Sequence, residues 1–256
     1  MSESDWVTST EPLAMLSFLQ PRGPLSDRKA RLFAVAAVSR LEPLLADDRS
    51  RRALRVAEGV ADGVADDAER AHAQELADAA RAEAEARYEA AVNESTYAEG
   101  DEVIAAGWRL LIPVDAAAAA HAALHPSATT AATDVVQLML STEEWGRQAA
   151  RWEAGVGRSP DDDAPGLGGH PRLAALLRDI AGNSPNSTTF TGAWRTEPVL
   201  ALARGIYDDR AWERLPVLAA ALEDAGCANE DILGHCRGPG PHVRGCFVLD
   251  AVLGKA

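Results

Sequence analysis

Apolar residues recur along most of the chain with the three- and four-residue spacing of a helix face, and the two-residue alternation of a strand is missing. The pattern predicts an all-α fold, a multi-helix bundle-like array. Gly and Pro clusters, with Asp, Asn and Ser at capping positions, separate the predicted helices. The predicted segments are 13–19, 27–42, 48–64, 66–92, 103–112, the Ala-rich 116–124, 133–152, 172–180, 199–206, 215–222, 230–236 and a last helix that begins at Pro241.

The stretch 66–92 is rich in Ala, Glu and Arg and poor in large apolar residues. Such a composition favours a helix but offers little to bury, so we expect a long and largely exposed helix. Just before it, a basic cluster lies on the first turns of the helix that Asp47 or Asp48 caps. Because that is the unfavourable end of the helix dipole for cations, we expect these arginines to pair with carboxylates or with a partner. The cluster is Arg49, Arg51, Arg52 and Arg55.

A Gly-, Pro- and Asp-rich segment at 155–171 is long for a connection inside a compact domain. We therefore interpret it as a linker between two helical subdomains. The first would be an N-terminal helical region, 1–154, and the second a C-terminal helical region, 172–256, which contains a loop rich in Cys, His and Arg.

The chain carries 39 Asp and Glu against 25 Lys and Arg, a formal net charge of −14. This balance argues against nucleic-acid binding, which depends on neutralising phosphates. It suits a solvated acidic surface or a partner protein with a basic face. The longest uncharged apolar runs, such as 116–124, are far shorter than the roughly 18 residues of a membrane span, so we expect no membrane partner. The acidic opening Met1–Asp5 is unlike a signal peptide, and we expect a cytoplasmic protein.

The run from Cys227 to Leu253 contains all three cysteines and two of the six histidines. If the last helix begins at Pro241, His242 and Cys246 lie four residues apart on one face, which is a reasonable spacing for metal ligands. Cys236 could supply a third ligand, and Cys227 or His235 a fourth, to a tetrahedral zinc ion. The sequence lacks the paired C-x2-C of specific zinc motifs. The alternative is that the cysteines are ordinary buried thiols.

Two arginines, Arg237 and Arg244, flank the Gly/Pro loop of the same run. Glycines that let the backbone approach a ligand and a helix N-terminus beyond them would suit a small anion. Pro241 removes one amide donor from such a site. The alternative is that both arginines pair with Asp or Glu of neighbouring helices.

Nucleophilic catalysis by a cysteine would need a nearby histidine and an orienting carboxylate. Cys236 or Cys246 with His242 and Asp250 is conceivable, but no flanking signature supports it. We assign no catalytic residue and expect a protein that is not an enzyme.

Two segments resemble a family of uncharacterised all-helical proteins of GC-rich, planctomycete-type bacteria. One runs from Ser26 to Ala53, and the other from Leu215 through the string HCRGPGPHVRGC at 235–246. The string is specific, whereas the helical segments are not. The resemblance implies a helical fold and no particular activity. Family members have cysteines in the stretch that matches 35–38, where this chain has none.

The stretch 209–226 is also similar to short helical modules that accompany leucine-rich repeats in such genomes. Our leading interpretation is therefore a non-enzymatic, acidic helical module for protein interaction. The alternatives are a zinc-binding protein that uses the C-terminal Cys/His cluster, and a binder of small anionic ligands.

Overall fold

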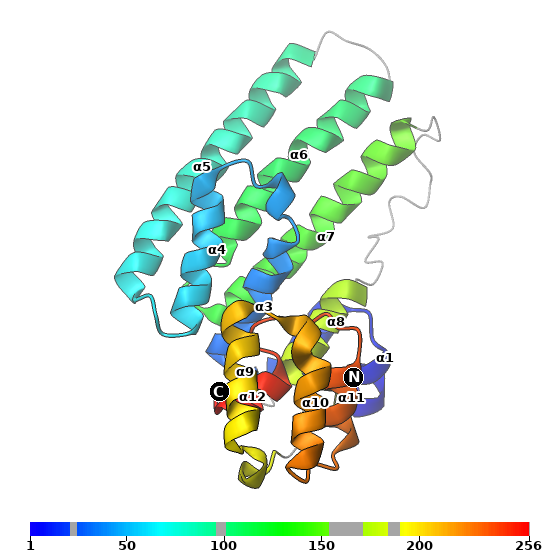
Figure 1. The fold of residues 1–256 in the computed structure, drawn as a ribbon. Coiled ribbons are helices and arrows are strands. Elements are labelled where there is room, and N and C mark those ends of the chain that lie inside the picture. The colour runs from blue at the N-terminus through cyan, green and yellow to red at the C-terminus, as the bar shows by residue number, and fades with distance from the viewer. Residues whose placement is uncertain (21–24, 96–100, 154–170, 184–189, 256) are drawn as a thin grey trace. The chain divides into compact units, whose positions relative to one another are not determined.

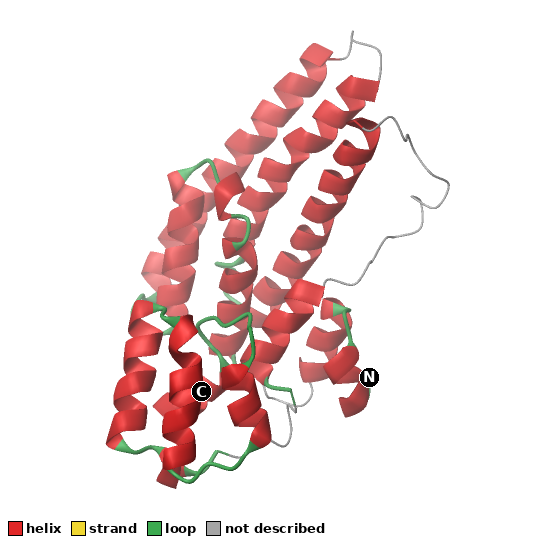
Figure 2. Cartoon of the chain, turned by 45° about the vertical axis from the view of Figure 1, so that its right-hand side comes forward, coloured by secondary structure: helices red, strands yellow, loops and turns green. Residues whose placement is uncertain are grey.

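The computed structural model describes residues 1–20, 25–95, 101–153, 171–183 and 190–255. These residues form twelve α-helices joined by loops and short 3₁₀ turns, without a β-strand, so the predicted all-α class is confirmed (Figure 2). None of the described helices is long and apolar enough to span a membrane. The helices are α1 (Glu3–Thr8), α2 (Pro12–Leu19), α3 (Asp27–Ser39), α4 (Asp48–Ala61), α5 (Asp67–Ser95), α6 (Asp101–Ala122), α7 (Ala128–Glu153), α8 (Pro171–Ala181), α9 (Glu197–Asp209), α10 (Leu215–Asp224), α11 (Glu230–Arg237) and α12 (Phe247–Leu253).

The chain divides into two compact units, and the division differs from the predicted one. Unit 1 combines Met1–Ala36 with Gly169–Ala256, and unit 2 is the continuous stretch Ala37–Gly168. The first 36 residues therefore belong with the C-terminal helices and not with the region 1–154. The predicted linker at 155–171 lies outside the described residues, apart from Pro171, which begins α8.

Hydrogen bonds between distant segments explain why the start of the chain belongs to unit 1. The indole of Trp6 on α1 donates to the carbonyl of Gly182 at 3.0 Å, and Trp6 is fully buried. In return, Arg178 of α8 donates to the carbonyl of Trp6 at 3.1 Å. On α3, Arg28 forms an ion pair of 2.7 Å with Asp250 of α12, whose side chain is 1% exposed. The hydrophobic periodicity of one segment does not predict such long-range pairs, and the predicted domain boundary therefore lies elsewhere.

Unit 2 is built from α4, α5, α6 and α7, and α6 packs against the other three (Figure 1). Helix α5 buries an alanine stripe at i, i+4, i+7 and i+11, which is one helix face. The other positions of this helix are mostly exposed, as expected, and the small side chains of the stripe allow neighbouring helices to approach closely. The stripe is Ala73, Ala77, Ala80 and Ala84.

Helix α6 runs through Pro113, where two separate segments were predicted. A proline inside a helix removes one backbone hydrogen bond and costs about 3 kcal/mol. The strong helix formers beyond it, and the burial of Ala116, Ala119 and Ala120 in unit 2, outweigh this cost.

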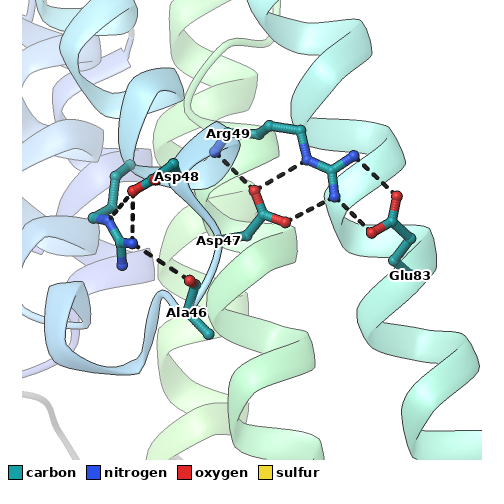
Figure 3. Close-up of polar contacts among 6 residues, drawn as sticks. Ala46, Asp47, Asp48, Arg49 and Glu83 are labelled. Atoms are coloured by element: carbon teal, nitrogen blue, oxygen red, sulfur yellow. Dashed lines mark hydrogen bonds and ion pairs between the residues drawn. The ribbon is translucent and has the colours of Figure 1, made fainter.

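Two arginines of the basic cluster at the start of α4, Arg49 and Arg51, pair with carboxylates as predicted. Figure 3 shows the contacts of Arg49. The carboxylate of Asp47 caps α4 by accepting from the amide of Arg49 at 2.8 Å. The Arg49 guanidinium bridges Asp47 at 2.7 Å and Glu83 of α5 at 2.6 Å. Its hydrogen bonds lower the pKa of both carboxyl groups. Arg49 thus connects the start of α4 to α5.

Local caps define the end of α10 and the start of α11. Gly226 has φ +87°, and its amide donates to Glu223 while the next amide donates to Leu222, which together form a Schellman motif. Asn229 caps α11 by accepting from the amides of Asp231 and Ile232. These caps fix the position from which α11 presents His235.

Candidate metal centre

Helix α12 begins at Phe247, not at Pro241, so the prediction that His242 and Cys246 share a helix face is wrong. Both lie in the connection between α11 and α12. Gly240 and Gly245 have φ of +86° and +92°, which a right-handed helix does not allow. Even so, the fold brings His242 and Cys246 together, through a loop.

Four side chains converge in unit 1 as a group that could hold a metal ion: Asp179, His235, His242 and Cys246. One ligand atom from each lies within 4.8 Å of the others. Asp179 comes from α8, His235 from α11, and the other two from the loop. Cys246 is 0% exposed, and the side chains of the other three are between 1% and 9% exposed. Three separate chain segments therefore contribute to one buried polar cluster.

Asp179 is the centre of this cluster. Its Oδ1 accepts from Nδ1 of His242 at 3.0 Å and lies 3.1 Å from Nε2 of His235. Its Oδ2 accepts from the amide of Val243 at 3.1 Å, which fixes the loop relative to α8. A buried carboxylate needs several donors to offset its desolvation, and this one has them.

Both ring nitrogens of His242 face oxygen acceptors, Asp179 on one side and the carbonyl of Gly238 at 3.3 Å on the other. Each acceptor needs an N–H, so this arrangement favours the doubly protonated imidazolium. Burial by itself lowers the pKa of His242, but the hydrogen bond and charge of Asp179 outweigh it and raise the pKa above its usual value. The imidazolium thus balances the charge of the buried carboxylate.

His235 connects the carboxylate to the thiol, because its Nε2 also lies 3.2 Å from Sγ of Cys246. Burial and the nearby charge of Asp179 raise the pKa of Cys246 well above that of a free thiol. The thiol is therefore protonated in this environment, and a bound cation would be needed to stabilise its thiolate.

The other two cysteines predicted as ligands, Cys227 and Cys236, lie outside this group. Both are buried in the apolar core formed by α9, α10, α11 and α12. Burial raises the pKa of Cys236 to about 12, as expected for an inert core thiol. Their side chains pack with Leu, Ile and Val residues. The structure therefore supports the alternative that these two cysteines are ordinary buried thiols.

Sequence reasoning missed Asp179 and gave His235 only as an alternative. One signal for Asp179 was available, because it lies on the apolar face of α8 among buried neighbours. A carboxylate at such a position needs a buried partner. Those neighbours are Leu173, Ala174, Leu176, Leu177 and Ile180.

The two arginines predicted to bind an anion have different protein contacts. Arg237 pairs with Glu223 of α10. The guanidinium carbon of Arg244 lies 4.8 Å from the ring centroid of Tyr207 on α9. An anion would have to compete with Glu223 for Arg237, so an anion site at this pair stays a prediction.

A cavity of about 230 Å³ opens beside the polar cluster. Three of the four converging residues line it, and Cys246 does not. Its remaining wall consists of Ala175, Arg178, Asn183, Gly234 and the loop 238–241.

No family model, no curated protein and no solved structure matches this chain. A hypothesis about its function therefore depends on the chemistry of the site, which offers one carboxylate, two imidazoles and one thiol.

Proposed function

We propose that unit 1 binds a divalent transition metal ion, zinc foremost, through Asp179, His235, His242 and Cys246. The observation that supports this proposal is the convergence of four different ligand atoms within 4.8 Å in a buried cluster. Zinc accepts thiolate, imidazole and carboxylate ligands together in tetrahedral geometry.

The ligand atoms of the cluster lie close enough together to hold such an ion after small movements. Zinc bonds of about 2.0–2.3 Å in a tetrahedron place neighbouring ligand atoms about 3.3–3.6 Å apart. Oδ1 of Asp179 now lies 3.0 Å from Nδ1 of His242 and 3.1 Å from Nε2 of His235, and Nε2 of His235 lies 3.2 Å from Sγ of Cys246. In a tetrahedral site these three pairs would move apart by a few tenths of an ångström, and the remaining pairs, now within 4.8 Å, would move closer together.

Charge balance also supports the proposal. The carboxylate of Asp179 and the thiolate of Cys246 together neutralise a divalent cation, with two neutral imidazoles completing the set. Binding would release the proton of the thiol and that of the His242 imidazolium. The ion would then connect α8, α11 and the loop, and its binding free energy would add to the stability of unit 1.

The test is metal analysis of the full chain purified without chelator. About one equivalent of zinc per chain is expected, and less than about a tenth of an equivalent would contradict the proposal. Titrating chelator-treated protein with Co²⁺ should give the visible bands of a tetrahedral site and a thiolate-to-metal band in the near ultraviolet.

A pair of matched cysteine variants distinguishes the proposed metal ligand from a buried core thiol. Cys246→Ala should abolish the thiolate band, whereas Cys236→Ala, which removes an equally buried thiol outside the group, should keep it. A thiolate band that follows Cys236 instead of Cys246 would contradict the assignment of ligands. The interaction module favoured by the sequence stays a prediction.

A further inference from the structure

The four converging residues border the cavity unequally. Asp179, His235 and His242 line it, whereas Cys246 is fully buried on the side of the apolar core. A metal ion held among them would be covered on the thiolate side and would face the cavity on the other. Closed structural zinc sites lack such an open side, and sites that react with small molecules have one.

One arginine brings a positive charge to the cavity wall. Arg178, next to Asp179 in sequence, lines the cavity and keeps its guanidinium on the carbonyls of Trp6 and Ser9, at 3.1 and 2.9 Å. Those bonds involve neutral acceptors, so the positive charge of Arg178 is not neutralised by them. Asn183 adds an amide on the same wall. A divalent ion neutralised by one carboxylate and one thiolate would leave this wall with a net positive charge.

The size of the cavity limits the ligand. A cavity of about 230 Å³ has room for several water molecules. An inorganic phosphate or a short carboxylic acid fits this space.

We infer that the cavity binds a small oxyanion, a phosphate or carboxylate group, which donates one oxygen to the metal and faces Arg178. This inference rests on the proposed metal centre, with Asp179, His235, His242 and Cys246 as protein ligands. The anion becomes a fifth ligand, and the coordination of zinc can expand from four to five.

The experiment uses the cobalt-loaded full chain, whose visible spectrum reports the coordination number. Titration with inorganic phosphate and, separately, with acetate should lower and shift the visible bands as the ion changes from four to five ligands. For ions of four or five heavy atoms, half-saturation near or below about 1 mM is expected. The two titrations distinguish a phosphate site from a carboxylate site.

Two variants fill the cavity without changing a ligand. Gly234 has open space at its Cβ position and lines the cavity, so Gly234→Leu should weaken anion binding by at least about tenfold while cobalt still binds. Ala175→Leu acts from the opposite helix and should do the same. Gly192→Leu is the control, because Gly192 also has open space at its Cβ position but does not line the cavity.

The outcomes separate this inference from the proposed function. If the protein takes up no cobalt, the metal centre is wrong and the inference falls with it. If cobalt binds with a tetrahedral spectrum that neither anion changes, only the inference is overturned. It is also overturned if Gly234→Leu and Ala175→Leu respond to the anions as the parent chain does.

Discussion

Oδ1 of Asp179 lies 3.0 Å from Nδ1 of His242, across 63 residues of sequence. This pair, together with His235, holds α8, α11 and the loop before α12 around one buried carboxylate. The cluster is an internal polar network, and we propose that its members are also metal ligands. Both roles predict that conservative substitutions at these few residues change stability or metal binding strongly.

Asp179→Asn should destabilise unit 1 by about 3 kcal/mol, because it removes a buried charge whose partners then stay desolvated. The change keeps the size of the side chain, so packing is preserved and the loss reports on the network. The measurement is the midpoint of urea unfolding, followed by circular dichroism, with chelator present to exclude metal.

Asp208→Asn is the matched control, since Asp208 is exposed on α9. Surface changes of this kind alter the free energy of unfolding by about 0.5 kcal/mol or less. Equal effects of the two substitutions would show that the cluster adds no stability.

The stability of the metal-free protein should depend on pH through His242. Because its pKa is raised in the folded state above the ordinary value of 6.5, its ion pair stabilises the fold fully below that pH. The contribution is lost as the pH rises through the folded pKa. Urea unfolding of the parent chain and of His242→Gln should therefore differ most at acidic pH and converge at alkaline pH. A difference that grows with pH would contradict this prediction.

Gly245→Ala should destabilise unit 1 by more than about 1 kcal/mol. Gly245 has φ +92°, and a Cβ there would lie 3.1 Å from Cδ1 of Leu32 on α3, so the alanine meets both backbone strain and a packed neighbour. Gly234→Ala in α11 is the control with the opposite sign, because its Cβ meets open space and helix propensity improves by about 0.5–1 kcal/mol. Thermal unfolding of both variants checks the pair.

Ala77→Leu should destabilise unit 2 by about 1–3 kcal/mol, because Ala77 is fully buried in the alanine stripe of α5. The exposed Ala79 offers the same substitution two residues later, and Ala79→Leu should change the free energy of unfolding by less than about 0.5 kcal/mol. If both variants unfold at the same urea concentration, the alanine stripe tolerates larger side chains and close helix packing is not required there.

Local sequence signals predicted the helices and several of their ends. Asp47 caps α4 as predicted, because an N-cap acts on amides only two or three residues away. The sequence predicted the structure less well where segments that are distant in the chain contact each other. Pro241 suits a first helical position, yet α12 begins six residues later, after the glycines that bend the loop.

The candidate site shows the same limit. His242 and Cys246 were singled out for a helix spacing that does not exist, and they converge through the tertiary fold. Asp179 could have been noticed only as a charge on an apolar helix face. Its partners lie more than fifty residues further along the chain. The hydrophobic periodicity of a single helix contains no information about contacts over such sequence separations.

The division of the chain has a consequence for biosynthesis. Unit 2 is continuous, whereas the segments of unit 1 stand before and after it. During translation unit 2 can fold while the ribosome is still making α8 to α12, and the first helices must wait for them. Trp6 then has no carbonyl of Gly182 to bind until about 180 residues have been made. We expect pauses in translation after unit 2 to expose the early helices to chaperones.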